Sequence, residues 1–272
     1  PGLAKTLMIK SLSELLDLDF NRIQFTPDLM PSDITGTEII EQNRTTGKRS
    51  FKFFKGPVFS NILLADEINR TPPKTQSALL EAMQEHKITN AGKVYDLDQP
   101  FFVLATQNPI EQEGTYPLPE AQLDRFMFNI LVNYPSRDEE VSIVNSTTSN
   151  PKIVLKKIMA KKEILEFQSL IPRVPIAENV VEYAVDLVNS TRPGKDASSF
   201  VNNWIEWGAG PRASQHLVIG AKAKALLNGK SSPNIADIKA LALPILRHRI
   251  IPNFNADAEG MKVDDIIKEI LK

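Results

Sequence analysis

Two adjacent carboxylates, Asp66 and Glu67, directly follow the apolar run 61–65. One carboxylate can hold a divalent cation, and a second beside it can accept a proton from an attacking water. An almost wholly apolar run predicts a strand buried on both faces, and open α/β sheets bind ligands at the carboxyl ends of such strands. The pair therefore predicts a site for metal-assisted attack of water. Two solvated acids at a strand end are the alternative interpretation.

The first residues of the sequence form a second candidate site, for phosphate. Residues 1–6 are similar to the second half of the loop G-x-x-x-x-G-K-[ST], and Lys5 and Thr6 supply its closing pair. An apolar helical stripe starts at Leu7, so a helix N-terminus is expected here, where free N–H groups favour an anion. The loop's first glycine is absent and Ala4 replaces its second, so this pattern alone is a weak indication. The candidate phosphate-binding residues are Gly2, Leu3, Ala4, Lys5, Thr6 and Leu7.

A polar amide and an arginine extend the set of candidates. Asn108 follows the apolar run 101–106, which predicts a second buried strand, so its side chain is expected at the same sheet edge as Asp66. There it could orient a water or contact a terminal phosphate; formation of a turn before Pro109 is the alternative. Arg212 stands at the start of a predicted helix. The helix dipole disfavours a cation there unless a bound phosphate or a nearby acid balances it.

The elements that position these residues change in character near the middle of the chain. In the first half, strands are predicted at 20–25, 61–66, 101–106 and 128–132, a helix at 74–85, a hairpin over 88–95, and an inserted hairpin or extended loop with a basic tip over 38–56. From Arg137 onward, helical periodicity predicts helices at 139–146, 162–170, 177–190, 214–227, 235–246 and 263–271. We therefore predict an α/β core with a parallel sheet flanked by helices over residues 1–135, and a small all-α domain over residues 136–272.

The composition excludes several classes of site. The chain contains no cysteine, which excludes disulfides, thiolate metal sites and a cysteine nucleophile, and which is compatible with a reducing cytosol. The three histidines are scattered without metal-ligand spacing. A formal net charge of −1 gives no overall attraction to nucleic acid or to anionic membranes. No apolar run approaches the length of a transmembrane helix, and we expect a cytoplasmic protein.

The order and spacing of these segments resemble those of the AAA+ ATPases, and in particular the MoxR branch. The resemblance covers nearly the whole chain and is strongest over residues 22–36, 61–84, 101–125 and 208–214. It implies a P-loop NTPase core of the AAA+ type followed by a helical lid. The stretch 38–56 is similar to the insert that marks this clade. Because the first P-loop glycine is missing, we expect that the sequence begins inside the motif.

The resemblance implies roles for the residues around ATP. Gly2, Lys5 and Thr6 match the remaining part of Walker A, in which Lys5 would reach the β- and γ-phosphates and Thr6 would bind Mg²⁺. Asp66 and Glu67 match Walker B. Asp66 would hold the metal, directly or through water, and Glu67 would orient and deprotonate the attacking water.

Three further residues match motifs elsewhere in the family. Asn108 matches sensor 1. Arg125, in the run Leu-Asp-Arg-Phe, is similar to the arginine finger that one subunit supplies to its neighbour's site. Arg212, in the run Gly-Pro-Arg-Ala, resembles sensor 2, which would report the nucleotide state to the lid. If Arg125 acts between subunits, an isolated monomer should be nearly inactive.

The function that the resemblance implies is ATP hydrolysis by a homo-oligomeric ring, of six subunits by family analogy, that remodels protein partners as a chaperone does. The partner would be a protein substrate or a von Willebrand-type adaptor, and metal or cofactor insertion is one task implied. Two alternatives stay open: a nucleotide-dependent interaction module without productive hydrolysis, and a nucleic-acid motor. The near-neutral charge argues against nucleic acid, and no membrane partner is expected.

Overall fold

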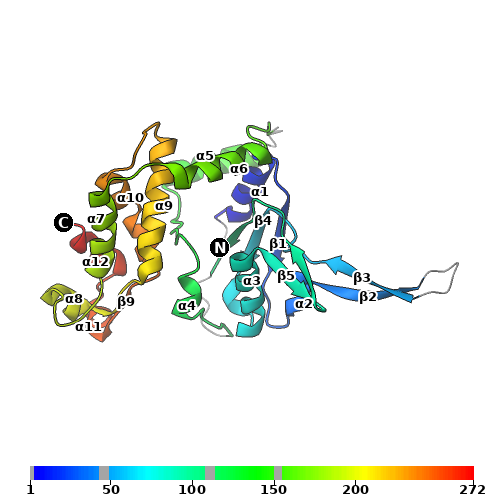
Figure 1. The fold of residues 1–272 in the computed structure, drawn as a ribbon, viewed down its shortest axis with the longest axis horizontal. Helices are drawn as coiled ribbons and strands as arrows, with labels where there is room; N and C mark the ends of the chain where they lie inside the picture. The colour runs from blue at the N-terminus through cyan, green and yellow to red at the C-terminus, as the bar shows by residue number, and fades with distance from the viewer. Residues whose placement is uncertain (1–2, 43–48, 108–113, 150–154) are drawn as a thin grey trace. The chain divides into compact units, whose positions relative to one another are not determined.

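The computed structural model describes residues 3–42, 49–107, 114–149 and 155–272. The chain divides into two compact units, shown with their elements in Figure 1. The first comprises Pro1–Leu118 and Val132–Leu165, and the second comprises Pro119–Leu131 and Glu166–Lys272. The sequence indicated one boundary at residue 135. By their contacts, the residues around Arg125 group with the second unit, and the helix after residue 135 groups with the first.

A three-stranded parallel sheet forms the centre of the first unit. Its strands are β1 (Phe20–Gln24), β4 (Ile62–Asp66) and β7 (Phe102–Ala105), in the order β1-β4-β7. Strand β4 lies in the middle and is buried from its first residue to its fourth, which is why it appears in the sequence as an unbroken apolar run. Parallel pairing brings the carboxyl ends of all three strands to one edge, where Gln24 is in register with Asp66.

Helices accompany this sheet as predicted. Helix α1 (Lys5–Leu15) packs its buried Ile9 against Ile62 and Leu64 of the central strand. After β4 the chain forms a short 3-10 turn, η1 (Ile68–Arg70), and then helix α3 (Pro73–Glu85). The first unit also contains α2 (Pro31–Thr35) and α5 (Arg137–Thr148).

Both predicted hairpins are present. Strands β5 (Lys87–Asn90) and β6 (Lys93–Asp96) pair across a tight turn in which Ala91 and Gly92 have positive φ, as a two-residue hairpin turn requires. Strands β2 (Gly36–Gln42) and β3 (Arg49–Lys55) form a longer antiparallel hairpin, which we call the arm. Figure 1 shows the arm extending away from the three-stranded sheet. Its basic tip, residues 43–48, lies outside the described residues.

Two glycines form the base of the arm. A Cβ added to Gly36 would lie 2.2 Å from the carbonyl oxygen of Phe54 and 2.6 Å from the nitrogen of Gly56. A Cβ added to Gly56 would lie 2.3 Å from the carbonyl oxygen of Ile34. Gly36 also has a φ of +100°, a conformation that L side chains rarely adopt. The two backbones therefore approach so closely that neither position has room for a side chain.

The second unit is helical with one small sheet. Its helices are α4 (Glu120–Leu123), α7 (Glu178–Asn189), α8 (Ser199–Trp204), α9 (Pro211–Leu227), α10 (Ile235–Leu246), α11 (Phe254–Glu259) and α12 (Val263–Ile270), and α6 (Lys161–Leu170) crosses the division between the units. Helices α9, α10 and α12 share one core with α7, built around fully buried Leu217, Ile238 and Ile266. Strands β8 (Ile205–Trp207) and β9 (Ile251–Pro252) add a two-stranded sheet that the sequence analysis did not predict.

The predicted strand at 128–132 is wrong. These residues have no strand assignment and pair with no strand among the described residues. Their backbone instead bonds to helix α10 and its end: the Asn129 N–H donates to the Pro244 carbonyl at 2.8 Å, and Arg247 donates to the Asn129 carbonyl at 2.9 Å. An apolar run of five residues is ambiguous by pattern alone, and here local packing decided its form. None of the helices in the described part of the chain combines the length and apolar character that crossing a bilayer requires.

Candidate nucleotide site

The carboxylate of Asp66 lies at the end of the middle strand of the sheet. It is the last residue of β4, and its side chain is mostly covered. The Thr106 hydroxyl donates to Oδ1, and Arg22 donates to Oδ2 from Nη2 at 2.7 Å and from Nε at 3.2 Å. Thr106 directly follows β7 and Arg22 lies on β1, so both neighbouring strands contribute a partner. This arrangement fixes the carboxylate from both sides.

Asp66 is kept ionised. Burial by itself would raise the pKa of this carboxyl, but the hydrogen bonds from Thr106 and Arg22 and the charge of Arg22 outweigh it, and the net pKa is lowered from its ordinary value. The charge of Lys5 acts in the same direction. Lys5 stands at the start of α1, so the charge of one candidate phosphate-binding residue acts on the Asp66 carboxylate. An ionised carboxylate beside a lysine is suited to hold a cation and a polyphosphate together.

Glu67 has a strained backbone and a restrained side chain. Its φ of 58° is in the left-handed region, which non-glycine residues seldom adopt and which is frequent at functional sites. Its N–H donates to the Thr106 hydroxyl oxygen at 2.9 Å. Its carboxylate oxygen Oε2 accepts from Gln24 Nε2 at 2.9 Å and lies 2.9 Å from Nε of Arg70. The turn after β4 thus directs the second carboxylate to the same edge as the first.

A buried amide supports this turn. Gln76 of α3 is fully buried, and its Nε2 lies within hydrogen-bond distance of the carbonyl oxygens of Ile68, Thr71 and Tyr116 at 2.9–3.2 Å. The bonds to Ile68 and Thr71 are buried, so loss of this donor would deprive buried carbonyls of a hydrogen bond. One side chain therefore ties the segment after Glu67 to helix α3 and to the segment around Tyr116.

The helix start at Lys5 fits the predicted phosphate-binding loop. Helix α1 has 11 residues, no acid in its first turn and no side chain capping its first N–H groups. Ala4 precedes it with a φ of 51°. Lys5 and Thr6 are half-buried at this end. Free N–H groups, a positive dipole end and a lysine favour an anion. Leu3 and Leu7 flank this start, whereas Gly2 lies outside the described residues.

The residues present also fit a magnesium ion that is held mainly by phosphate. Asp66 supplies one ionised carboxylate and Thr6 a hydroxyl, and Mg²⁺ commonly takes one or two protein oxygens, with phosphates and water completing its shell. No group of three or more acidic or histidine side chains that could hold a metal occurs in the described ranges. An all-protein metal cage is therefore not present in that part of the chain. Asn108 lies outside the described residues, three positions after the end of β7.

Arg125 and Arg212 belong to the second unit. Arg212 is in the first turn of α9, and its Nη1 donates to Asp124 Oδ2 at 2.8 Å. A neighbouring acid therefore balances the cation at this helix start, which is the alternative that the sequence left open. Asp124 directly precedes Arg125. The guanidinium of Arg125 makes no hydrogen bond or ion pair with any other residue of the described ranges.

A buried guanidinium that sequence analysis missed lies beside them. The side chain of Arg249 is 1% exposed, and its Nε donates to Asp124 Oδ1 at 2.7 Å. His216 and His248 adjoin it, and burial and then the Arg249 charge lower the pKa of each histidine to about 4. Asp124 is therefore shared between two arginines. Nothing in the basic run 247–249 distinguishes the inward-facing Arg249 from a surface arginine at a helix end.

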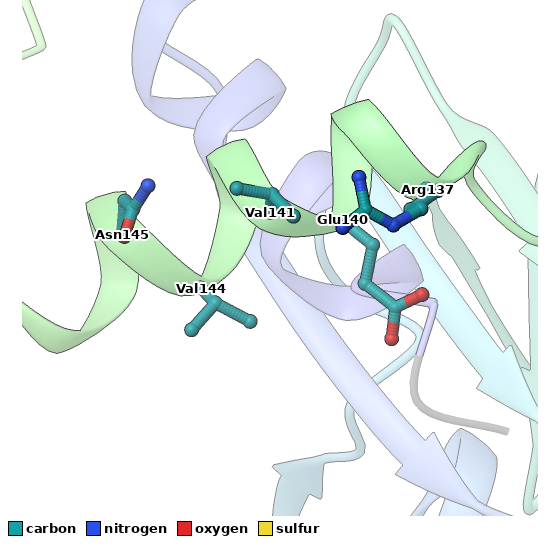
Figure 2. Close-up of a pocket in the computed structure, with 5 residues that line it drawn as sticks. All are labelled: Arg137, Glu140, Val141, Val144 and Asn145. Atoms are coloured by element: carbon teal, nitrogen blue, oxygen red, sulfur yellow. The ribbon is translucent and has the colours of Figure 1, made fainter.

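A hollow on helix α5 is lined by none of these residues. Figure 2 shows that all five side chains lining it come from this one helix: Arg137, Glu140, Val141, Val144 and Asn145. None of them is a candidate site residue. Val141 and Val144 are about half exposed, so the hollow is an open strip of helix surface without converging polar groups, and we assign no chemistry to it.

Two family models match the chain. The model of the ATPase family associated with various cellular activities (AAA) matches residues 1–128, and that of the AAA lid domain matches residues 198–270. A solved crystal structure from Cytophaga hutchinsonii superimposes with a TM-score of 0.89 at 47% identity, over 100% of this chain and 82% of that one. Fold and site together define a nucleotide-hydrolysing AAA-type core with a helical lid.

Relatives narrow this class. The chain is 43% identical to the uncharacterized protein YeaC of Bacillus subtilis, over 100% of this chain and 81% of YeaC. It is 41% identical to Chaperone MoxR1 of Mycobacterium tuberculosis, over 100% of this chain and 71% of that protein. It is 28% identical to the protein MoxR of Paracoccus denitrificans. The chain belongs to the MoxR family of AAA+ ATPases.

Proposed function

We propose that this ATPase works as a homo-oligomeric ring that hydrolyses ATP with Mg²⁺ to remodel a protein partner. The observation that supports the proposal is the pair of carboxylates, Asp66 and Glu67, at the end of β4, with Asp66 held ionised in part by the charge of Lys5. A structural role alone would not need an ionised, restrained carboxylate next to a second one with a strained backbone.

The residues divide the chemistry of phosphoryl transfer to water. Lys5 and the N–H groups of α1 bind the phosphates, and Asp66 with Thr6 holds the metal. When bound, Mg²⁺ supplies positive charge that offsets the charge on the phosphate oxygens. Glu67 accepts the proton of the attacking water once a water replaces one of its present partners. Asn108 orients that water as sensor 1.

The second unit supplies two further cations. Arg125 acts as an arginine finger at the site of a neighbouring subunit, a contribution on the order of 10³–10⁵ in rate. Its guanidinium makes no hydrogen bond or ion pair within the described residues, and such a group is available for an external anion. Arg212 acts as sensor 2, with Asp124 as its counter-ion when no nucleotide engages it. A finger of this kind makes the ring, which we propose to be a hexamer, the active form.

Similarity to a protein named Chaperone MoxR1 supports remodelling as the output of the ATPase cycle. We propose that the partner is a protein substrate, reached directly or through a von Willebrand-type adaptor, and that metal or cofactor insertion into the partner is one such task. The arm is a candidate for contact with the partner, because Ile40 and Phe51 on it are 59% and 71% exposed.

The test uses Glu67→Gln, which removes the proposed base and keeps the shape of the side chain. This variant should bind ATP as the wild type does and release phosphate at least a hundredfold more slowly. Turnover at the wild-type rate would exclude Glu67 as the base. Affinity capture of the ATP-bound variant from cells should then enrich a protein partner that Lys5→Ala does not enrich.

Subunit mixing tests the ring. Arg125→Ala should lose turnover and keep nucleotide affinity, and mixing it with Lys5→Ala subunits should restore part of the activity, because each lacks what the other supplies. Absence of rescue at every mixing ratio would contradict a finger that acts across an interface.

A further inference from the structure

One buried side chain, that of Arg249, makes several hydrogen bonds to the segment that carries Arg125. The guanidinium of Arg249 has five N–H donors, and they meet six acceptors. Four of these acceptors belong to residues 124–127: the Asp124 Oδ1 at 2.7 Å, the Asp124 carbonyl at 2.9 Å, the Phe126 carbonyl at 2.7 Å and the Met127 carbonyl at 3.3 Å. The other two are the Ile245 carbonyl and His216 Nδ1.

This pattern brackets Arg125. The carbonyl groups of the residues before and after it, Asp124 and Phe126, both accept from Nη2 of Arg249. His248 adds a second donor to the Phe126 carbonyl, from Nε2 at 3.0 Å. The backbone of Arg125 is therefore immobilised on both sides, while its own side chain is half-buried and has no partner among the described residues.

We propose that Arg249 is a positioning residue for the arginine finger, fixing the carbonyl groups of Asp124 and Phe126, the two sequence neighbours of Arg125, so that the Arg125 guanidinium is presented to the neighbouring subunit in one place. This inference rests on the proposed role of Arg125. A displacement of about 1 Å in a group that stabilises a transition state can cost on the order of a hundredfold in rate. The backbone around Arg125 must therefore be held rigidly for the finger to give its full rate enhancement.

The geometry of the hydrogen bonds at position 249 favours arginine over lysine. A guanidinium is a planar fork that serves several acceptors at fixed angles, whereas an ammonium concentrates three donors at one point. Arg249→Lys would keep a positive charge toward Asp124 and lose most of the carbonyl contacts. We expect this variant to keep its fold and nucleotide affinity while the finger becomes mobile.

The first experiment measures kcat and KM for ATP in Arg249→Lys. The expected result is a kcat at least tenfold lower with KM within about twofold of wild type. Arg247→Lys is the matched control, because this arginine extends from the same helix end but pairs with Asp264 and donates to the Asn129 carbonyl, outside residues 124–127. It should keep at least half of the wild-type kcat.

A double-mutant cycle separates positioning from general stability. If Arg249 acts through Arg125, then adding Arg249→Lys to Arg125→Ala should lower kcat no further, since the finger is already gone. A purely structural role predicts a further loss. In mixed assemblies, Lys5→Ala subunits should rescue Arg249→Lys just as they rescue Arg125→Ala.

The outcomes distinguish this inference from the proposed function. Normal kcat in Arg125→Ala would overturn the finger and, with it, the positioning role. A large loss in Arg125→Ala with normal kcat in Arg249→Lys would overturn positioning alone, as would additive effects in the cycle. If Arg249→Lys does not fold, Asp124→Asn replaces it, because this variant removes one charge and leaves the three carbonyl contacts of the segment. A fall in kcat of at least threefold that vanishes in the Arg125→Ala background supports the proposal; any other result overturns it.

Discussion

Gln24 donates a hydrogen bond from Nε2 to Oε2 of Glu67 at 2.9 Å, across the paired ends of strands β1 and β4. Nε of Arg70 lies 2.9 Å from the same oxygen. One oxygen of the proposed catalytic carboxylate thus lies within reach of two protein donors. A carboxylate must give up at least one of them before that oxygen can accept a proton from water.

Gln24→Ala should therefore raise the basal ATPase rate. A net hydrogen bond is worth about 1 kcal/mol, which corresponds to a factor of about five in rate. We expect an increase of two- to fivefold in phosphate release without a partner protein, and no increase in a Glu67→Gln background. A lower rate in Gln24→Ala would show that Gln24 orients the base instead of restraining it.

The ion pair between Arg22 and Asp66 predicts a measurable titration. Arg22→Gln should raise the pKa of Asp66 toward its ordinary value, because one of the groups that lower it is removed. The lowered pKa in the folded state means that this pair contributes stability at neutral pH, which is lost as the pH falls through that pKa. Carbon-13 NMR of the Asp66 carboxyl group measures the shift directly. Lys10→Gln, an exposed charge removal on α1, is the control and should leave it unchanged.

The lowered pKa values of His216 and His248 predict that the folded protein loses stability in acid. Burial first, and the Arg249 charge second, lower both pKa values from 6.5 to about 4, so between these pH values the unfolded chain binds more protons than the folded one. Stability is therefore lost as the pH falls from about 6.5 to about 4, and this contribution is constant below that range.

His248→Gln should reduce this loss. The glutamine amide can still donate to the Phe126 carbonyl but does not titrate in this range. Melting temperatures at pH 7 and pH 4.5 should differ less in the variant than in the wild type. His86→Gln, at an exposed histidine of the first unit, should leave the difference unchanged. An equal drop in the wild type and in His248→Gln would contradict the assignment of His248 as neutral when folded.

Elements with a continuous apolar pattern could be predicted from the sequence, whereas elements whose form depends on a distant partner could not. Strand β4 and helix α10 were predictable because their apolar patterns are continuous, and α10 has its predicted bounds. The strand expected at 128–132 was wrong because a five-residue apolar run does not specify its partner. The central strand could therefore be assigned by composition alone, whereas this segment depended on its neighbours.

The site shows the same division. Asp66 and Glu67 could be identified from the sequence, because they are two adjacent acids that directly follow an apolar run. Thr106 and Gln24 have ordinary sequence surroundings, and they matter because parallel register places them beside those acids. Their position at strand ends was the available indication. Arg249 offered none, since only tertiary structure reveals that its guanidinium faces inward.

Because of the two glycines at the base of the arm, the direction of the arm does not depend on its exposed side chains. Gly36 and Gly56 set its direction by direct contact of main chain with main chain, so its outward-facing residues have no part in aiming it. Exchanging Ile40 or Phe51 should thus change the exposed surface of the arm without changing its direction. A chain that keeps both glycines would keep the direction of the arm whatever side chains the arm exposes.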